Sequence, residues 1–212
     1  MVKVTGLRAG RSRVKRVNVF LDGRMAFSLE AEVALRENLR VGQELSDSQI
    51  EALARSDCFQ RCLNAAALYL SYRPRSEAEL RERLRRRGFD DRSVATVLER
   101  LKEQGLVDDV AFAEFWRDSR KHFSPRSRWL TGLEMRQKGV PEDIIAQTVD
   151  TVDDDDSAYQ AAVAKLRSLS QTDYQGFRRR LGGYLRRRGF SYGVINDTLR
   201  RIWQEQRENN TR

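Results

Sequence analysis

A segment of about fifty residues that occurs three times constrains this chain more than any other feature. A glycine followed by an apolar residue recurs at intervals of fifty-one and fifty residues, at Gly88, Gly139 and Gly189. One register then places apolar residues four before and six, ten and thirteen after each glycine: Leu84, Val94, Leu98 and Leu101; Met135, Ile145, Val149 and Val152; Leu185, Ile195, Leu199 and Ile202. This agreement indicates an internal repeat, and such repeats fold as stacked supersecondary units.

Each copy predicts helices. In the first, Ser76 followed three residues later by Glu79 is a capping box, and Leu84 lies on the apolar face of the helix that follows. Gly88 ends that helix, because glycine adopts the left-handed conformation of a helix C-terminus. A further helix with apolar residues at helical spacing extends to Leu101.

The other helix boundaries follow from similar signals. We expect a helix from Asp57 in the first repeat, a cap at Asp108 or Asp109 in the second, and helices 177–188 and 192–206 in the third. Further predicted starts are Pro125, Pro141 and Ser157. The Pro-Arg-Ser opening of residues 74–76 and 125–127 is missing from the third repeat, where Gly182 and Gly183 also interrupt the middle helix. Glycine in a helix interior costs roughly 1 kcal/mol relative to alanine, so this helix is expected to be locally weaker.

The first fifty-five residues have a different pattern. Asp22-Gly23 predicts a hairpin between strands 14–21 and 25–29. A short helix over 30–38 and a second one capped near Ser46 follow. Basic residues precede the hairpin, where they contact nucleic acid or form a frayed N-terminus: Lys3, Arg8, Arg11, Arg13, Lys15 and Arg16.

The sequence therefore predicts a mainly α fold. Three tandem three-helix repeats form an elongated curved array, preceded by a small N-terminal β-hairpin plus short helices. The expected domains are residues 1–55, 56–105, 106–155 and 156–212.

The net charge of the chain indicates which classes of partner it binds. The 212 residues include 40 basic and 31 acidic ones, a net charge of +9 that is mostly arginine. Arginine suits planar contacts to phosphate and carboxylate, so nucleic acid or an acidic protein is the expected partner. The alternative is that these charges only solvate helix faces. With no targeting or membrane-spanning segment, we expect a cytoplasmic protein whose two cysteines, Cys58 and Cys62, are buried thiols.

The sequence offers little for catalysis. It has no phosphate-binding glycine loop, and His122 has no paired acid or nucleophile at a motif spacing. Asp153 to Asp156 are consecutive, which suits the N-terminal turn of a helix better than a metal site. We expect no enzyme activity, catalytic residue, metal or cofactor.

Three segments carry a family resemblance. Residues 105–109, Gly-Leu-Val-Asp-Asp, precede a helix with Phe112, Ala113 and Trp116, and SPRSRWLTGLEMRQKGVPEDII follows. These motifs, with the hairpin and short helices of residues 17–50, resemble the RecX family of recombinase regulators over nearly the whole chain.

The resemblance implies a modulator of the recombinase RecA in recombination, DNA repair and the SOS response. Such a protein binds the groove of the RecA filament on single-stranded DNA and mainly inhibits its ATPase, strand-exchange and co-protease activities. We expect a monomer that touches DNA directly or within the filament, and no membrane partner. The alternative is a general basic helical DNA-binding protein that competes for DNA.

Arginine clusters are the candidate partner- and nucleic-acid-binding residues. The stronger cluster lies in a segment without acidic residues, 174–190: Arg178, Arg179, Arg180, Arg186, Arg187 and Arg188. The second cluster lies in the middle helix of the first repeat, where neighbouring glutamates neutralise part of its charge: Arg81, Arg85, Arg86 and Arg87. Phe112, Phe115 and Trp116 are expected in the core.

Overall fold

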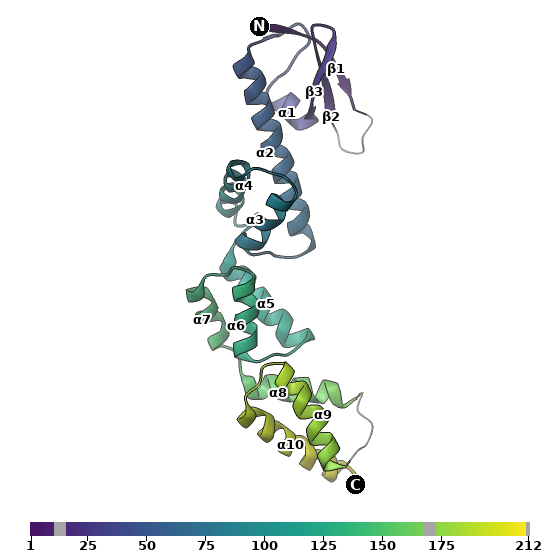
Figure 1. Ribbon diagram of the computed structural model, residues 1–212, viewed down its shortest axis with the longest axis vertical. Helices are drawn as coiled ribbons and strands as arrows, with labels where there is room; N and C mark the ends of the chain where they lie inside the picture. The colour runs from purple at the N-terminus through teal and green to yellow at the C-terminus, as the bar shows by residue number, and fades with distance from the viewer. Residues whose placement is uncertain (11–15, 168–172, 211–212) are drawn as a thin grey trace. The chain divides into compact units, whose positions relative to one another are not determined.

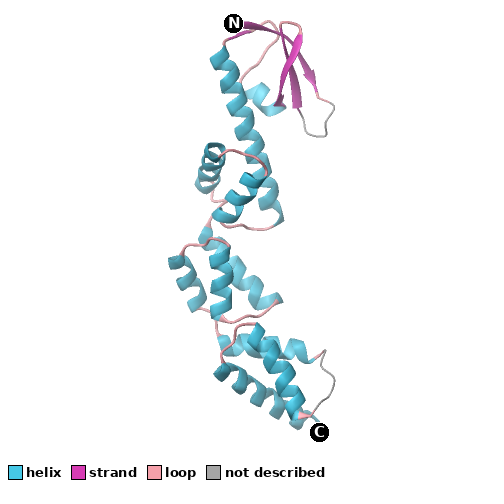
Figure 2. Cartoon of the chain, viewed as in Figure 1, coloured by secondary structure: helices cyan, strands magenta, loops and turns pink. Residues whose placement is uncertain are grey.

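The chain folds into two compact units. The computed structural model describes residues 1–10, 16–167 and 173–210, with ten helices and four strands among them (Figure 1). One unit comprises Met1–Arg73 and Leu80–Leu106, and the other comprises Pro74–Glu79 and Val107–Arg212. The strands precede all the long helices, as the sequence predicts (Figure 2).

An antiparallel sheet with strand order β3-β2-β1-β4 opens the first compact unit. Its strands are β1 (Val2–Ala9), β2 (Arg16–Leu21), β3 (Arg24–Glu30) and β4 (Glu44–Leu45). Asp22 and Gly23 connect β2 to β3 with φ values of 46° and 84°, the left-handed turn that Asp-Gly favours. The predicted hairpin is confirmed.

Strand β1 corrects the expectation of a frayed N-terminus for the part of the chain that carries Lys3 and Arg8. It pairs with β2 and with β4, and Val4 is fully buried. A register shift between Val4 and Gly6 interrupts the alternation of side chains. Because such a bulge breaks the period of two, the sequence pattern did not indicate this strand. Arg11, Arg13, Val14 and Lys15 lie outside the described residues.

Two helices cover the sheet, α1 (Ala31–Arg36) and α2 (Asp47–Tyr72). Ser46 and Gln49 form a reciprocal capping box at the start of α2. The prediction of one helix near Ser46 and another from Asp57 was wrong, because α2 is continuous for 26 residues. No helix-breaking residue lies between the two predicted starts, and a nucleated helix propagates. The predicted domain boundary at residues 55 and 56 falls inside this helix.

Asp57 has a tertiary role in the middle of α2. Its Oδ1 accepts a hydrogen bond of 2.6 Å from the Glu30 backbone N–H, and its Oδ2 lies 3.4 Å from a guanidinium nitrogen of Arg16. A buried carboxylate needs such partners to offset its desolvation. Asp57 therefore joins α2 to the ends of β2 and β3.

The first repeat comprises the second half of α2 with α3 (Glu77–Arg86) and α4 (Asp91–Glu103). Its predicted apolar positions are buried: Leu80, Leu84, Val94, Val97, Leu98 and Leu101. Cys58 and Cys62 are free thiols, half-buried and buried respectively. Burial, followed by the proximity of Cys58 and Asp90, raises the pKa of Cys62 to about 12, so this thiol stays protonated.

The second and third repeats lie together in the second compact unit. Their helices are α5 (Asp109–Phe123), α6 (Arg128–Gln137), α7 (Glu142–Asp150), α8 (Asp154–Leu166), α9 (Tyr174–Arg187) and α10 (Tyr192–Asn210). Asp108 caps α5, as predicted. Helix α8 begins three residues before the predicted Ser157, because Asp153 accepts hydrogen bonds from the N–H groups of Asp155 and Asp156.

The glycines that define the repeat have the predicted backbone. Gly88, Gly139 and Gly189 have φ values of 90°, 72° and 86°, a conformation that costs other residues about 1–2 kcal/mol. Each ends a middle helix and starts the turn to the third.

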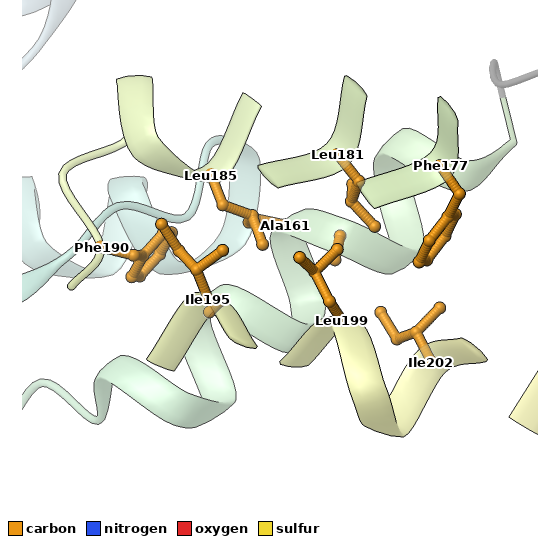
Figure 3. Packing of buried hydrophobic residues seen from close by; sticks show 10 residues of the cluster. Ala161, Phe177, Leu181, Leu185, Phe190, Ile195, Leu199 and Ile202 are labelled. Carbon is orange, nitrogen blue, oxygen red and sulfur yellow. The ribbon is translucent and has the colours of Figure 1, made fainter. Parts of the chain in front are cut away.

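Helix α9 is continuous through Gly182 and Gly183. A Cβ on Gly182 would lie 3.5 Å from Leu199 Cδ1, an ordinary van der Waals distance, so α10 would have room for an alanine there. Figure 3 shows Phe177, Leu181 and Leu185 of α9 facing apolar residues of α10 across this core.

Candidate nucleic-acid interface

Helix α9 presents exposed arginines on the side opposite its buried residues. Arg179 and Arg186 are seven residues apart, as are Arg180 and Arg187, and all four are exposed. Because seven residues make two helical turns, each pair forms a row about 10 Å long. Gly183 lies between the rows, and a Cβ there would lie 3.7 Å from Arg187 Nη1, so the guanidinium of Arg187 lies close to the glycine.

This surface lacks carboxylates of its own. No acidic residue occurs from 174 to 190, and Arg178 is also exposed. The guanidinium carbon of Arg186 lies 5.7 Å from the ring centroid of Tyr192, a cation–π geometry. The chemistry of this helix face suits phosphate groups or carboxylates on a partner.

Arg188 has a different setting from the rest of its predicted cluster. It is half-buried, and its Nη1 donates hydrogen bonds to Ser124 Oγ at 3.0 Å and to the Pro125 carbonyl at 2.8 Å. Its guanidinium also lies over the ring of Tyr184. Arg188 therefore joins the end of α9 to the loop before α6 by hydrogen bonds. Because its guanidinium is used in this way, we do not keep Arg188 among the candidate contact residues.

The cluster on α3 is partly compensated within its own repeat. Arg85 Nε lies 2.6 Å from Asp91 Oδ1, and Arg86 Nε lies 2.7 Å from Glu82 Oε1. Arg87 is exposed and Arg81 is half-buried. Exposed pairs of this kind contribute little to stability, but they reduce the field that an anionic partner would meet. The face of α9 is thus the stronger candidate.

Each Pro-Arg-Ser segment contacts the glycine turn of a later repeat within the second compact unit, to which Pro74–Glu79 also belong. Ser76 Oγ accepts a hydrogen bond from the Glu79 N–H and donates one to the Lys138 carbonyl. Gly139, the residue after Lys138, lies so close to Ala78 that a Cβ on the glycine would overlap the alanine side chain. The glycine turn of the second repeat therefore packs on the start of α3.

An equivalent contact, with the serine backbone N–H as donor in place of the hydroxyl, occurs between the second and third repeats. The Ser127 N–H donates a hydrogen bond of 3.0 Å to the Arg188 carbonyl. A Cβ on Gly189 would lie 2.8 Å from Leu130 Cβ and 3.2 Å from Trp129 Cε3. Pro-Arg-Ser is thus a motif of the junctions between repeats. It is present in the two repeats whose middle helix is contacted at its start by the glycine turn of the next repeat.

Sequence analysis missed a buried ionic cluster in the second repeat. Glu134 accepts hydrogen bonds from Trp116 Nε1 at 2.9 Å and Arg120 Nε at 2.6 Å, and it also pairs with Arg126. Burial lowers the pKa of Arg120, although an arginine remains charged. Trp116 packs inside the repeat beside buried Phe112, which agrees with their predicted core role.

The ionisable residues considered for catalysis or metal binding have structural contacts. His122 Nδ1 lies 2.8 Å from the Asp118 carbonyl in the last turn of α5. Within the described ranges, no three metal-ligating side chains are grouped to hold an ion. In the same ranges no helix is long and apolar enough to cross a bilayer.

Four family descriptions match successive parts of the chain. The Regulatory protein RecX N-terminal domain matches residues 2–46, and the first, second and third RecX three-helix domains match residues 62–101, 108–149 and 153–199. The chain belongs to the RecX family. Its members are regulatory proteins by name, and the matches follow the strands and repeats of the structure.

Individual relatives support the same assignment. A Regulatory protein RecX from Clostridium botulinum (strain Eklund 17B / Type B) is 30% identical, over 94% of this chain and 96% of the relative. One from Bacillus velezensis is 29% identical, over 92% of this chain and 76% of the relative. A crystal structure of regulatory protein RecX matches with a TM-score of 0.65 and 25% identity, over 93% of this chain and all of that one. RecX from Lactobacillus salivarius, at 21% identity and a TM-score of 0.58, shares the fold over 69% of this chain and 97% of that one.

Proposed function

We propose that this chain is a non-enzymatic regulator of the recombinase RecA. It binds the RecA filament on single-stranded DNA and mainly inhibits ATP hydrolysis, strand exchange and co-protease activity. The observation that carries this proposal is the membership of nearly the whole chain, strands and three repeats together, in a family of regulatory proteins. The link to RecA is what resemblance to that family implies.

The exposed arginines of α9 support a role in filament contact. A RecA filament on DNA is a repeating target with a phosphate backbone inside it. Two arginine rows in a segment without acidic residues offer charge-assisted hydrogen bonds to such phosphates or to acidic side chains of the recombinase. Helix packing holds the backbone of both rows in place before binding, so only the arginine side chains have to become ordered.

A second candidate is a general DNA-binding protein that competes with RecA for the strand. The same basic surface favours it, because a patch of arginines attracts any polyanion. The two candidates differ in whether RecA adds affinity. A filament regulator binds a complete filament more tightly than the strand alone, and a competitor binds the free strand better.

Co-sedimentation distinguishes the candidates. The single strand is held on beads in both cases, so that bare DNA and filaments pellet equally, and we expect this chain to pellet with RecA filaments assembled on that strand with a slowly hydrolysed ATP analogue. At 150 mM salt and equal strand concentration, more chain should pellet with filaments than with DNA alone. The same result should hold with excess free single-stranded DNA. Equal pelleting on bare DNA, or complete removal by that competitor, would favour the DNA-binding alternative.

A further inference from the structure

Three large aromatic side chains are exposed around the junction of the second and third repeats. Phe123, Trp129 and Tyr192 have 87%, 66% and 68% of their surface exposed. They come from three different helices, at the end of α5, the start of α6 and the start of α10. We call these three residues the aromatic cluster.

Contacts around Arg188 and Gly189 hold the three residues to one junction. Phe123 precedes Ser124, whose Oγ accepts a hydrogen bond from Arg188. Trp129 Cε3 lies 3.2 Å from the place of a Cβ on Gly189. Tyr192 follows that glycine by three residues and contacts Arg186 through its ring.

The exposure of the cluster calls for a partner. Single exposed apolar residues are ordinary on protein surfaces, but several at one place mark a binding site. Other residues fill the cores of the two repeats, and the three rings are not part of these cores. Their exposure therefore has no role in the packing of the repeats. The aromatic cluster is therefore available for a ligand.

The charge beside the cluster selects the ligand class. The helix that ends at this junction carries Arg179, Arg180, Arg186 and Arg187, with no acidic residue from 174 to 190. Carboxylates lie at this junction as well: Arg128, the residue before Trp129, lines a depression with Asp150, Asp153, Asp154 and Asp155. The side chain of Asp150 pairs with Arg128, and Asp154 accepts a hydrogen bond from the Arg128 backbone N–H. Proteins hold single strands with exposed rings beside basic side chains, the bases stacked on the rings and the phosphates bound by the cations.

We propose that the aromatic cluster stacks unpaired bases of single-stranded DNA while the arginines of α9 hold the adjoining phosphates. Trp129 provides the largest ring and Tyr192 the ring that is linked to an arginine. This site gives the chain direct contact with bases, in addition to any contact with RecA. The inference rests on the proposed function in one respect: the single strand that the site binds is the strand within the RecA filament.

An abasic strand separates stacking from charge. We would measure fluorescence anisotropy of a labelled twenty-nucleotide oligothymidine and of an abasic deoxyribose-phosphate strand of equal length, without RecA. Trp129→Ala is expected to weaken oligothymidine binding about fivefold or more, since stacking of one base contributes about 1–3 kcal/mol. Its affinity for the abasic strand should stay within about twofold of the wild type, because the phosphates are unchanged.

Two further variants complete the test. Trp129→Phe keeps an aromatic face and should recover most of the affinity, and circular dichroism of both Trp129 variants should match the wild type, which excludes a folding defect. Tyr72→Ala removes an exposed ring of the other compact unit, 74% exposed on α2, and should alter neither affinity. Equal loss on both strands, or no loss on either, would overturn the stacking site. If the wild type binds neither strand yet inhibits RecA, this inference fails and the proposed function stands.

Discussion

Replacing Arg179, Arg180, Arg186 and Arg187 together by glutamine is expected to raise the concentration for half-inhibition of RecA about tenfold or more. A charge-assisted hydrogen bond contributes about 1.5–3 kcal/mol, so the loss of even one contact weakens binding about tenfold. The side chains are exposed, and glutamine is a good helix former, so α9 should persist. The measurement is DNA-dependent ATP hydrolysis by RecA from the same organism, titrated with each variant.

A control variant with the same loss of charge tests whether position matters. Arg24, Arg40, Arg55 and Arg100 are exposed residues of the first compact unit, and their replacement by glutamine also removes four positive charges. We expect this control to inhibit RecA nearly as well as the wild type. If both variants lose inhibition equally, net charge and not the face of α9 is responsible. Full inhibition by the α9 variant with intact circular dichroism would eliminate the proposed surface.

Gly189→Ala is expected to destabilise the second compact unit by more than the cost of placing an alanine in the left-handed conformation. The backbone at φ 86° costs an alanine about 1–2 kcal/mol. The new Cβ would also lie 2.8 Å from Leu130 Cβ, and overpacking of this kind costs about 1–3 kcal/mol more. The same argument applies to Gly139→Ala, whose Cβ would meet Ala78. With a urea m-value of about 1–3 kcal/mol/M, the midpoint should fall by roughly 1 M or more.

Tryptophan fluorescence and a third variant make this test specific. All three tryptophans, Trp116, Trp129 and Trp203, lie in the second compact unit. Gly88 has a similar φ of 90°, but a Cβ there would meet nothing within 4 Å. Gly88→Ala should therefore leave the fluorescence transition unchanged and lower only the circular-dichroism transition of the first unit. If the three substitutions lowered the urea midpoint of their own units equally, contacts at the repeat junctions would add nothing to the cost of the left-handed backbone.

Features with a local signal could be predicted from the sequence. The left-handed turn at Gly88 and the cap at Asp108 depend on residues within one turn of the chain, so spacing and residue type suffice. The apolar register of the repeats was equally visible, because buried helix faces keep a period of about 3.6 residues. The same reasoning gave the exposed arginines of α9, since no acidic residue interrupts that segment.

Features that depend on distant partners could not be predicted. Asp57 resembles a helix cap in sequence, but its carboxylate accepts the Glu30 N–H, twenty-seven residues away. Arg188 continues an arginine run, but it binds Ser124 at a separation of sixty-four residues. Its setting depends on how the repeats pack, and one sequence contains no signal for that. The exposure of Trp129 depends on the same junction.

The measurement that tests the central claim most directly is single-stranded-DNA-dependent ATP hydrolysis by RecA, titrated with the wild-type chain from far below to above the recombinase concentration. A filament regulator should inhibit at a small fraction of the RecA concentration, because one bound molecule affects many subunits of a growing filament. Inhibition should persist when more DNA is added. Inhibition only near saturation of the strand, relieved by extra DNA, or no inhibition at any ratio, would contradict the proposed function.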